Sequence, residues 1–305
     1  MKNAIIFPGQ GSQYVGMGLD LYENSNYAKE KFDEANEILG YSLSSICFEG
    51  PLEVLKETRY TQPALFTHSA ILFDLVKDKI EMHGTAGHSV GEYASLYAAG
   101  VLSFEEGLKL VSLRGELMFS SGIEKPGTMY AIIGLDDNIV EEICKQATAE
   151  SNNEVIVPAN YNCPSQLVVS GSKDLLHRTA PKFKDAGAKI VKELVVSGAF
   201  HSPLLQDAAN KLSNEIHKID FQNAKVPVYL NTTSFPEQNG QKIKEALIQQ
   251  LTSPVLWSQI LKNMNNDGFN SFYEVGAGNV LQGLVKRTLS DVKIYGFDKF
   301  ENLSN

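Results

Sequence analysis

The sequence predicts an α/β protein with two subdomains: a large one formed by residues 1–126 and 197–305, and a small one formed by residues 127–196 and inserted in it. Three observations support this prediction. Short apolar segments alternate with amphipathic helical segments in the outer parts of the chain. The middle part has the order β-α-β-β-α-β, which is typical of a ferredoxin-like unit. With 305 residues, the chain is long enough for one large domain and a smaller one.

The composition is that of a soluble globular protein, with 43% hydrophobic and 21% charged residues. No apolar run approaches the roughly 18 residues that a membrane-spanning helix needs, and no charged-then-apolar leader opens the sequence. We therefore expect a cytoplasmic protein without a membrane partner. The formal net charge of -9 argues against a nucleic-acid partner, because duplex binding needs a basic face.

The three cysteines, Cys47, Cys144 and Cys163, are odd in number and lack Cys-x-x-Cys spacing. Both features argue against a disulfide framework and against a zinc site. We expect all three thiols to be reduced, and we expect no metal.

One strand and two helices are predicted in the first quarter of the chain. Residues 4–7 are a short apolar run followed by proline, which indicates a buried strand. The next segment is similar to a dinucleotide-binding loop, but Tyr14 stands where the third glycine of Gly-x-Gly-x-x-Gly would be. We therefore expect a loop whose backbone N–H groups face a ligand oxygen. Helices are predicted at 27–39 and 61–75, with Pro63 in the first turn of the second.

Residues 87–92 are Gly-His-Ser-Val-Gly-Glu and have the Gly-x-Ser-x-Gly pattern of a nucleophile elbow. In such an elbow a sharp strand-to-helix turn exposes the hydroxyl, which makes Ser89 a candidate acyl-accepting nucleophile. The large subdomain is then expected to be α/β-hydrolase-like, with a short parallel sheet. The alternative is a glycine-rich turn that caps an ordinary helix. Residues 81–86 form a poor strand by propensity, which weighs against the elbow.

A helix is predicted from Ser103 to about Phe119, because residues 103–106 form a capping box. Its apolar residues share one broad face, and Arg114 lies inside that face. A buried guanidinium is costly unless it is paired, so Arg114 is expected to meet a protein carboxylate or a ligand carboxylate. A structural ion pair and a snorkelling surface arginine are the alternatives without a functional role.

The remaining elements follow from periodicity and turn residues. The inserted subdomain is expected to have strands at 129–134, 155–160, 166–171 and 189–196 and helices at 138–149 and 175–186. Pro181 falls inside the second of these helices and weakens that prediction. Beyond the insert we expect helices at 204–219, 243–251, 257–265 and 279–289 and strands at 226–230, 272–275 and 293–297.

A serine nucleophile needs a base, and the chain has six histidines. Five have simpler explanations: a solvated helix face, a structural position, or a place next to Ser89 from which the ring points away. These five are His68, His83, His88, His177 and His217. His201 stands in a loop of small residues just before a helix, where its ring is able to reach a cleft and take the proton of Ser89. The alternative is a polar loop histidine.

Eight ordered motifs run nearly from end to end of the chain. They are Phe-Pro-Gly-Gln-Gly-Ser-Gln (7–13), Thr-Gln-Pro-Ala (61–64), Gly-His-Ser-Val-Gly-Glu (87–92), Arg-Gly (114–115), Asn-Tyr-Asn (160–162), Ala-Phe-His-Ser (199–202), Gln-Leu with Pro-Val-x-Trp (250–251 and 254–257) and Glu-Val-Gly-Ala-Gly (274–278). With these motifs the chain resembles the malonyl-CoA:acyl-carrier-protein transacylases and the related acyltransferases of polyketide synthases.

The resemblance implies a catalytic dyad without an acidic third member. Ser89 would be the nucleophile and His201 its base, and the histidine would be oriented by the backbone carbonyl at Gln250. The backbone N–H groups of Gln10 and Val90 would form the oxyanion hole.

The resemblance also assigns the pocket. Arg114 would bind the free carboxylate of a malonyl group in a bidentate pair. Phe200 would disfavour a methyl branch on the acyl group. Gln62, Asn160 and Asn162 match pocket-lining positions, although asparagines near the strands of the small subdomain are also expected simply to cap turns.

We therefore expect transfer of a malonyl group from malonyl-CoA through Ser89 to the phosphopantetheine thiol of an acyl carrier protein, in fatty-acid or polyketide synthesis. No cofactor other than these thioester partners is expected, and a monomer is expected because most members of the family are monomers. Lys286, Arg287 and the lysines of the small subdomain are candidate contacts for the acidic carrier, or simply solvated charges.

Two other classes of function remain open at this level. A serine hydrolase of the α/β-hydrolase type would use the same elbow, but it would place an Asp or Glu between the serine and a late histidine and would give Arg114 no role. A carrier-binding module without catalysis would have no need for Ser89, His201 and Arg114 together.

Overall fold

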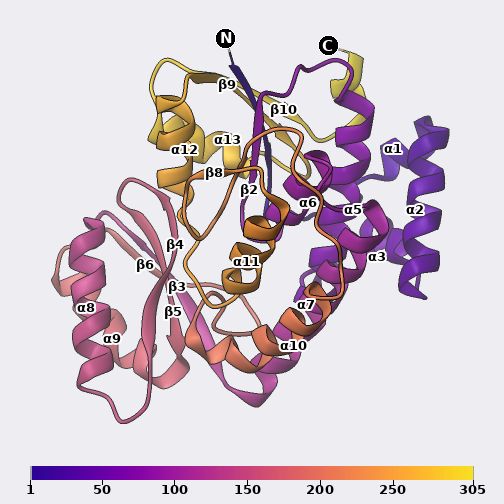
Figure 1. The fold of residues 1–305 in the computed structure, drawn as a ribbon. Helices are drawn as coiled ribbons and strands as arrows, with labels where there is room; N and C mark the ends of the chain where they lie inside the picture. The colour runs from indigo at the N-terminus through magenta and orange to yellow at the C-terminus, as the bar shows by residue number, and fades with distance from the viewer. Residues whose placement is uncertain (1, 305) are drawn as a thin grey trace.

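The computed structural model describes residues 2–304 and contains two separate β-sheets (Figure 1). The larger sheet has the strand order β10-β9-β1-β2-β7-β8, and all neighbours are parallel except β7 and β8. Its strands are β1 (Lys2–Phe7), β2 (Gly84–Gly87), β7 (Val228–Tyr229), β8 (Pro236–Glu237), β9 (Phe269–Val275) and β10 (Lys293–Phe297). The predicted fold class, an α/β protein with a short parallel sheet and a separate small sheet, is confirmed.

The smaller sheet is antiparallel and has the order β4-β5-β3-β6. Its strands are β3 (Gly127–Ile133), β4 (Ile156–Cys163), β5 (Gln166–Ser172) and β6 (Ile190–Glu193), and the helices α8 (Asp137–Ala149) and α9 (Lys173–Asp185) pack on it. This is the strand order of a ferredoxin-like unit, and it lies to one side of the molecule, at the lower left of Figure 1. All six elements fall within residues 127–196. The subdomain limits themselves stay a prediction.

Strand β1 lies at the centre of the large subdomain and contributes to two hydrophobic clusters. Ile5 and Phe7 pack into one cluster, and Ala4 and Ile6 pack into the other, because alternate side chains of a strand point to opposite faces. Helices cover both faces of the sheet. They are α1 (Leu19–Asn24), α2 (Asn26–Leu39), α3 (Leu43–Glu49), α4 (Leu52–Leu55), α5 (Thr58–Val76), α6 (Gly91–Ala98), α7 (Phe104–Glu124), α10 (Gln206–Ile216), α11 (Gly240–Gln250), α12 (Trp257–Asn266) and α13 (Val280–Thr288), with 3₁₀ turns η1 (Pro203–Leu205) and η2 (Phe300–Ser304).

Strand β2 forms although its sequence, Gly-Thr-Ala-Gly, is unfavourable for a strand. Tertiary packing explains the choice of small residues. A Cβ on Gly84 would lie 2.6 Å from the ring of Phe269, and a Cβ on Gly87 would lie 1.9 Å from the carbonyl oxygen of Gly91. The crowded surroundings of β2 therefore require small residues, and these small residues are the reason for its low strand propensity.

Two helix boundaries differ from the sequence-based expectation. Helix α5 begins at Thr58, so Pro63 lies inside the helix and not in its first turn. The helix tolerates the missing donor because the residues from Thr61 to Phe73 are buried, and packing outweighs local propensity. The segment predicted as one helix at 204–219 is a 3₁₀ turn followed by α10, which ends at Ile216. Strand β6 is shorter than expected and ends at Glu193.

The three cysteines are buried and free, as expected. Within residues 2–304, no helix is long and apolar enough to cross a membrane. The same residues contain no group of three or more His, Cys, Asp or Glu side chains arranged to hold a metal ion.

Candidate active site

Ser89 lies in the sharp turn between β2 and α6, which is the place expected for a nucleophile elbow. Its backbone is left-handed, with φ of 53°. Such a conformation is uncommon for a residue other than glycine and is held by surrounding contacts. Gly91 allows the turn to close, because a Cβ there would lie 2.3 Å from the carbonyl oxygen of Phe7. The structure therefore has the strand-turn-helix context that distinguishes an elbow from an ordinary helix cap.

Asn231 holds this turn from the segment that follows β7. The Ser89 N–H donates to Oδ1 of Asn231 at 2.8 Å, and Nδ2 of Asn231 donates to the Gly87 carbonyl at 2.7 Å. Asn231 is fully buried, so both bonds lie in a medium where an unpaired polar group is costly. The side chain thus fixes the backbone on both sides of His88.

Ser89 and His201 are in hydrogen-bond contact although they are far apart in sequence. The Oγ of Ser89 lies 2.8 Å from Nε2 of His201. The other ring nitrogen, Nδ1, lies 3.0 Å from the carbonyl oxygen of Gln250 and 3.1 Å from that of Ser253. Because carbonyls only accept, Nδ1 carries a proton and Nε2 is left free to accept the proton of the serine hydroxyl.

The imidazole of His201 is neutral near neutral pH. Burial lowers its pKa to about 3, and the positive charge of Arg114 lowers it further in the same direction. A neutral imidazole is the form that accepts a proton from a hydroxyl. Both the contact geometry and the charge state are therefore those of a base, His201, paired with a nucleophile, Ser89.

Arg114, on α7, is 1% exposed and reaches the same hydroxyl. Its Nη2 lies 3.0 Å from Oγ of Ser89 and 3.1 Å from Oε1 of Gln250, and its Nη1 lies 2.7 Å from Oε1 of Gln62. No carboxylate within residues 2–304 forms an ion pair with it. Both non-functional alternatives for Arg114, a structural ion pair and a snorkelling surface side chain, are therefore wrong.

A cavity of about 100 Å³ opens beside these groups. The small sheet contributes to its wall through Met129 of β3 and Asn160 of β4, and the segment that follows β6 contributes Leu194 and Val196. The full lining is Gln10, His88, Ser89, Val90, Arg114, Met118, Met129, Asn160, Leu194, Val196, Phe200 and His201. The cavity has room for a small acyl group, and a larger carrier of that group must lie outside it.

The other residues expected at the site fall into two groups. Gln10, Val90, Asn160 and Phe200 line the cavity. The side chain of Gln10 points away from Ser89 and donates to Oγ1 of Thr58 at 3.1 Å, so a role in the oxyanion hole would use its backbone.

Gln62 and Asn162 do not line the cavity but stand behind it. Gln62 accepts from Arg114, and its amide nitrogen lies 3.1 Å from the sulfur of Met118. Asn162 Oδ1 lies 2.9 Å from Nε2 of His88. Each side chain thus contacts a residue of the cavity wall, Arg114 or His88, and the expected roles of Gln62 and Asn162 in the pocket or in orienting its residues stay a prediction.

Three contacts at the site are not predicted from the sequence. They come from Asn231, from the Ser253 carbonyl, and from Glu92, which accepts from Gln250 and Asn231. Asn231 directly follows a parallel strand, and the carboxyl ends of such strands converge on the functional edge of a sheet. That rule would have found Asn231. The Ser253 carbonyl gives no sequence signal, because every residue has one.

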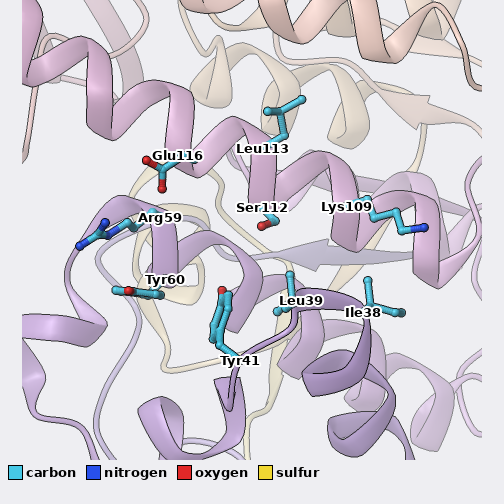
Figure 2. A pocket seen from close by; sticks show the side chains of 9 residues that line it. All are labelled: Ile38, Leu39, Tyr41, Arg59, Tyr60, Lys109, Ser112, Leu113 and Glu116. Atoms are coloured by element: carbon cyan, nitrogen blue, oxygen red, sulfur yellow. The ribbon is translucent and has the colours of Figure 1, made fainter.

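A second, larger hollow of about 520 Å³ lies on the surface between α2, α5 and α7 (Figure 2). Its side chains include Tyr41, Arg59, Lys109 and Glu116. None of its lining residues belongs to the Ser89 cavity. It contains no nucleophile in contact with a base, so the chemistry belongs to the smaller cavity.

The chain is similar to known acyltransferases along its whole length. The model of the acyl transferase domain family matches residues 4–297. The malonyl CoA-acyl carrier protein transacylase of Staphylococcus aureus is 42% identical over 305 residues, which cover 99% of this chain and 97% of the relative.

Solved structures give the same result. An acyl carrier protein S-malonyltransferase from Vibrio cholerae has a TM-score of 0.94 at 39% identity, covering 100% of this chain and 99% of that one. A malonyl-transacylase crystallised with a type II polyketide synthase acyl-carrier protein has a TM-score of 0.95 at 36% identity, covering 100% of this chain and 98% of that one. The chain therefore belongs to the acyl transferase domain family.

Proposed function

We propose that this protein transfers a malonyl group from malonyl-CoA, through an ester on Ser89, to the phosphopantetheine thiol of an acyl carrier protein. One observation carries the proposal: the guanidinium of Arg114 lies 3.0 Å from the nucleophilic hydroxyl inside a small buried cavity. An acyl group bound there meets a positive charge a few bonds from its reacting carbonyl. A short acyl group that ends in a carboxylate fits that arrangement.

Acylation uses the dyad as nucleophile and base. Oγ of Ser89 attacks the thioester carbonyl of malonyl-CoA while its proton moves to Nε2 of His201. The tetrahedral oxyanion accepts hydrogen bonds from the backbone N–H groups of Gln10 and Val90. The carbon–sulfur bond then breaks, and the proton held by His201 goes to the departing thiol of CoA.

Transfer to the carrier runs the same steps in reverse. The phosphopantetheine thiol gives its proton to His201 and attacks the Ser89 ester, and the proton returns to Oγ when the carbon–oxygen bond breaks. The chemistry calls for no cofactor beyond the two thiol carriers. The large phenyl ring of Phe200 in the cavity wall disfavours a methyl branch on the malonyl group.

The partner is an acyl carrier protein of fatty-acid or polyketide synthesis. An acidic carrier calls for cationic side chains on this protein, and Arg287 of α13 donates to Oε1 of Gln166 on the small subdomain at 2.7 Å. Arg287 and its neighbour Lys286 therefore stand where the two subdomains meet. We expect the enzyme to be cytoplasmic and to act as a monomer. Size-exclusion chromatography with light scattering measures the oligomeric state.

Hydrolysis of the acyl group is the competing function. A serine hydrolase of the α/β-hydrolase type orients its histidine with a carboxylate, whereas two backbone carbonyls meet Nδ1 of His201. Such an enzyme also has no use for Arg114 beside the nucleophile. A carrier-binding module without catalysis is disfavoured because it would have no need for the 2.8 Å contact between Ser89 and His201.

The test is a single-turnover experiment with labelled malonyl-CoA. The unmodified protein should acquire label, release CoA in equal amount and pass the label to added holo acyl carrier protein faster than to water. Ser89→Ala should acquire no label. Ser95→Ala is the matched control. It removes a buried hydroxyl on α6, the helix that follows Ser89, and should label normally. Label on the Ser89→Ala protein, or loss of the label to water with carrier present, would refute the proposal.

A further inference from the structure

Glu92 is a buried carboxylate that the chemistry above does not use. It lies in the first turn of α6, three residues after Ser89, and is 2% exposed. A buried charge is costly unless it is paired, yet no cation within residues 2–304 forms an ion pair with Glu92. Its partners are instead neutral donors at the active site.

Both carboxylate oxygens of Glu92 accept hydrogen bonds. Oε1 accepts from the backbone N–H of Asn231 at 3.2 Å, and Oε2 accepts from the side-chain Nε2 of Gln250. A backbone N–H cannot reverse its role, so Oε1 has to be an acceptor. Burial raises the pKa of Glu92 to about 7. The two hydrogen bonds oppose this effect, because they favour the ionised form. In its ionised form the carboxylate is an acceptor on both sides.

The side-chain amide of Gln250 therefore has only one favourable orientation. Its Nε2 also donates to the carbonyl oxygen of Ser89 at 3.0 Å, so two acceptors surround the nitrogen. The amide oxygen is left facing Arg114, where it accepts from Nη2 at 3.1 Å. If the amide were reversed, its NH₂ group would meet the guanidinium, donor against donor. Glu92 and the Ser89 carbonyl together determine which end of Gln250 meets Arg114.

Arg114 depends on this arrangement for its place at the nucleophile. Its guanidinium is held by two amide oxygens and one hydroxyl, from Gln62, Gln250 and Ser89. The nearest compensating negative charge is Glu92, on the far side of the Gln250 amide, and it acts on Arg114 through that amide. We define the chain Glu92–Gln250–Arg114 as the relay.

We propose that Glu92 is a positioning residue which, through the relay, holds the guanidinium of Arg114 at Ser89 and so determines the preference for acyl groups that carry a carboxylate. This inference rests on the proposed function. It goes further by assigning selectivity to a residue that touches neither the acyl group nor the reacting atoms. The Ser89–His201 contact does not use the relay, because His201 is oriented by the backbone carbonyl of Gln250 and not by its side chain.

Glu92→Gln tests the relay with almost no change of volume. The amide oxygen of the new side chain is able to accept from Asn231, which leaves an NH₂ group facing Nε2 of Gln250. We expect kcat/KM for malonyl-CoA to fall about 30-fold, mostly through KM, because a mispositioned cation loses charge-assisted binding. We expect kcat/KM for acetyl-CoA, and inactivation by an uncharged serine-directed phosphonate, to change less than about threefold, because the dyad is intact.

Glu274→Gln is the matched control. Glu274 is also fully buried, and its carboxylate accepts from the backbone N–H groups of Leu281 and Gln282, away from the cavity. The control reports what a buried Glu-to-Gln change does by itself. It should leave the ratio of malonyl to acetyl kcat/KM unchanged, whatever its effect on Tm. A purely structural role for Glu92 would lower both acyl activities together.

Gln250→Met provides a second and independent route. It removes the amide but keeps the backbone carbonyl that orients His201. We expect the same selective loss for malonyl-CoA, and the double variant with Glu92→Gln should lose little more than Gln250→Met alone, because both act through one contact. If either single variant keeps the wild-type ratio of malonyl to acetyl kcat/KM, the relay is refuted. If Glu92→Gln does not fold, Glu92→Asp, whose shorter side chain withdraws the carboxylate from Nε2 of Gln250, takes its place with the same expected selective loss.

The failure of this inference is distinguishable from the failure of the proposed function. Wild-type protein and Arg114→Ala test the function, because the first must prefer malonyl-CoA over acetyl-CoA and the second must lose that preference. If these two behave as expected while Glu92→Gln and Gln250→Met retain the preference, only the relay is wrong.

Discussion

The guanidinium of Arg114 donates a hydrogen bond to the nucleophilic oxygen of Ser89, with Nη2 3.0 Å from Oγ. The same oxygen lies 2.8 Å from Nε2 of His201, so the hydroxyl accepts from the arginine and donates to the histidine. The residue proposed to select the acyl group and the residue proposed to react with it are therefore in direct contact.

Arg114→Ala should abolish the preference for a carboxylated acyl group. We expect kcat/KM for malonyl-CoA to fall by at least about 100-fold, because a buried charge-assisted bidentate pair is lost. Transfer of an acetyl group should survive or rise, since acetyl makes no use of the charge. Steady-state assays with both acyl-CoAs measure the two values. Equal losses for both acyl groups would show that Arg114 is needed for folding or for the dyad and not for carboxylate binding.

The pH dependence of Ser89 reactivity should have no transition at the ordinary histidine pKa. Burial, followed by the charge of Arg114, lowers the pKa of His201 to about 3, and only the neutral imidazole accepts the serine proton. Inactivation by an uncharged phosphonate should therefore keep its rate as the pH falls from about 8 to about 5, where a histidine of pKa about 6.5 would already be protonated. A loss of rate centred near pH 6.5 would contradict this.

The same measurement on Arg114→Ala separates the two causes of the lowered His201 pKa, which are burial and the charge of Arg114. Removing the positive charge removes the second cause and leaves burial, so the pKa of His201 should rise but stay below its ordinary value. The acid limb of the pH–rate profile should move to higher pH. No movement would mean that the guanidinium exerts no electrostatic effect on the base.

Asn231→Ala should weaken both the fold and the elbow. It leaves the Ser89 N–H and the Gly87 carbonyl without their buried partner, which is expected to lower the free energy of unfolding by about 2 to 4 kcal/mol. Urea denaturation measures this loss, and phosphonate labelling measures the slower reaction of Ser89. Asn263→Ala is the control, because Asn263 makes two hydrogen bonds to Ser234 away from the cavity. It should cost stability without slowing the labelling.

Glu274 should make the protein less stable as the pH rises through neutrality. Burial raises the pKa of this carboxyl from its ordinary value of about 4.5 to about 7. The unfolded chain therefore releases the proton first, and the stabilisation that is present below pH about 4.5 is lost as the pH rises through about 7. The loss is on the order of 3 kcal/mol for a shift of this size.

Glu274→Gln isolates that contribution, because glutamine does not titrate. The stability of wild type relative to the variant, from urea denaturation at pH about 4.5 and about 8, should fall over this interval. A constant difference would mean that Glu274 has no raised pKa in the folded protein.

Much of the framework was predictable because the signals are local. The capping box of Ser103 and Glu106 is present as expected, and the βαββαβ order places every strand of the small sheet within a few residues. The dyad was predictable from motif context, since an elbow serine and a histidine in a loop of small residues leave few choices. The resemblance to a family supplied the rest, including the carbonyl of Gln250.

What escaped prediction depends on tertiary contact. Asn231 bonds to the Ser89 backbone and Gln250 bonds to Glu92 from parts of the chain that are distant from the elbow in sequence. Strand β2 has an unfavourable sequence because its glycines are needed for close packing. Gly84 packs against Phe269, which is distant in sequence, and Gly87 packs against Gly91, where the chain turns back on the strand. Gln62 and Asn162 contact Arg114 and His88 from behind the cavity wall, and sequence position does not tell which side of a neighbour a side chain occupies.

The two carbonyls that meet His201 have a consequence for what the ester on Ser89 reacts with. Without an adjacent anion, a positively charged imidazole is poorly stabilised, and the ring is a weak base. A thiol parts with its proton at a pKa of about 8.5, whereas water does so only at about 15.7. A weak base is therefore adequate for a thiol and inadequate for water, so the proposed ester on Ser89 is expected to persist until the thiol of a carrier reaches it.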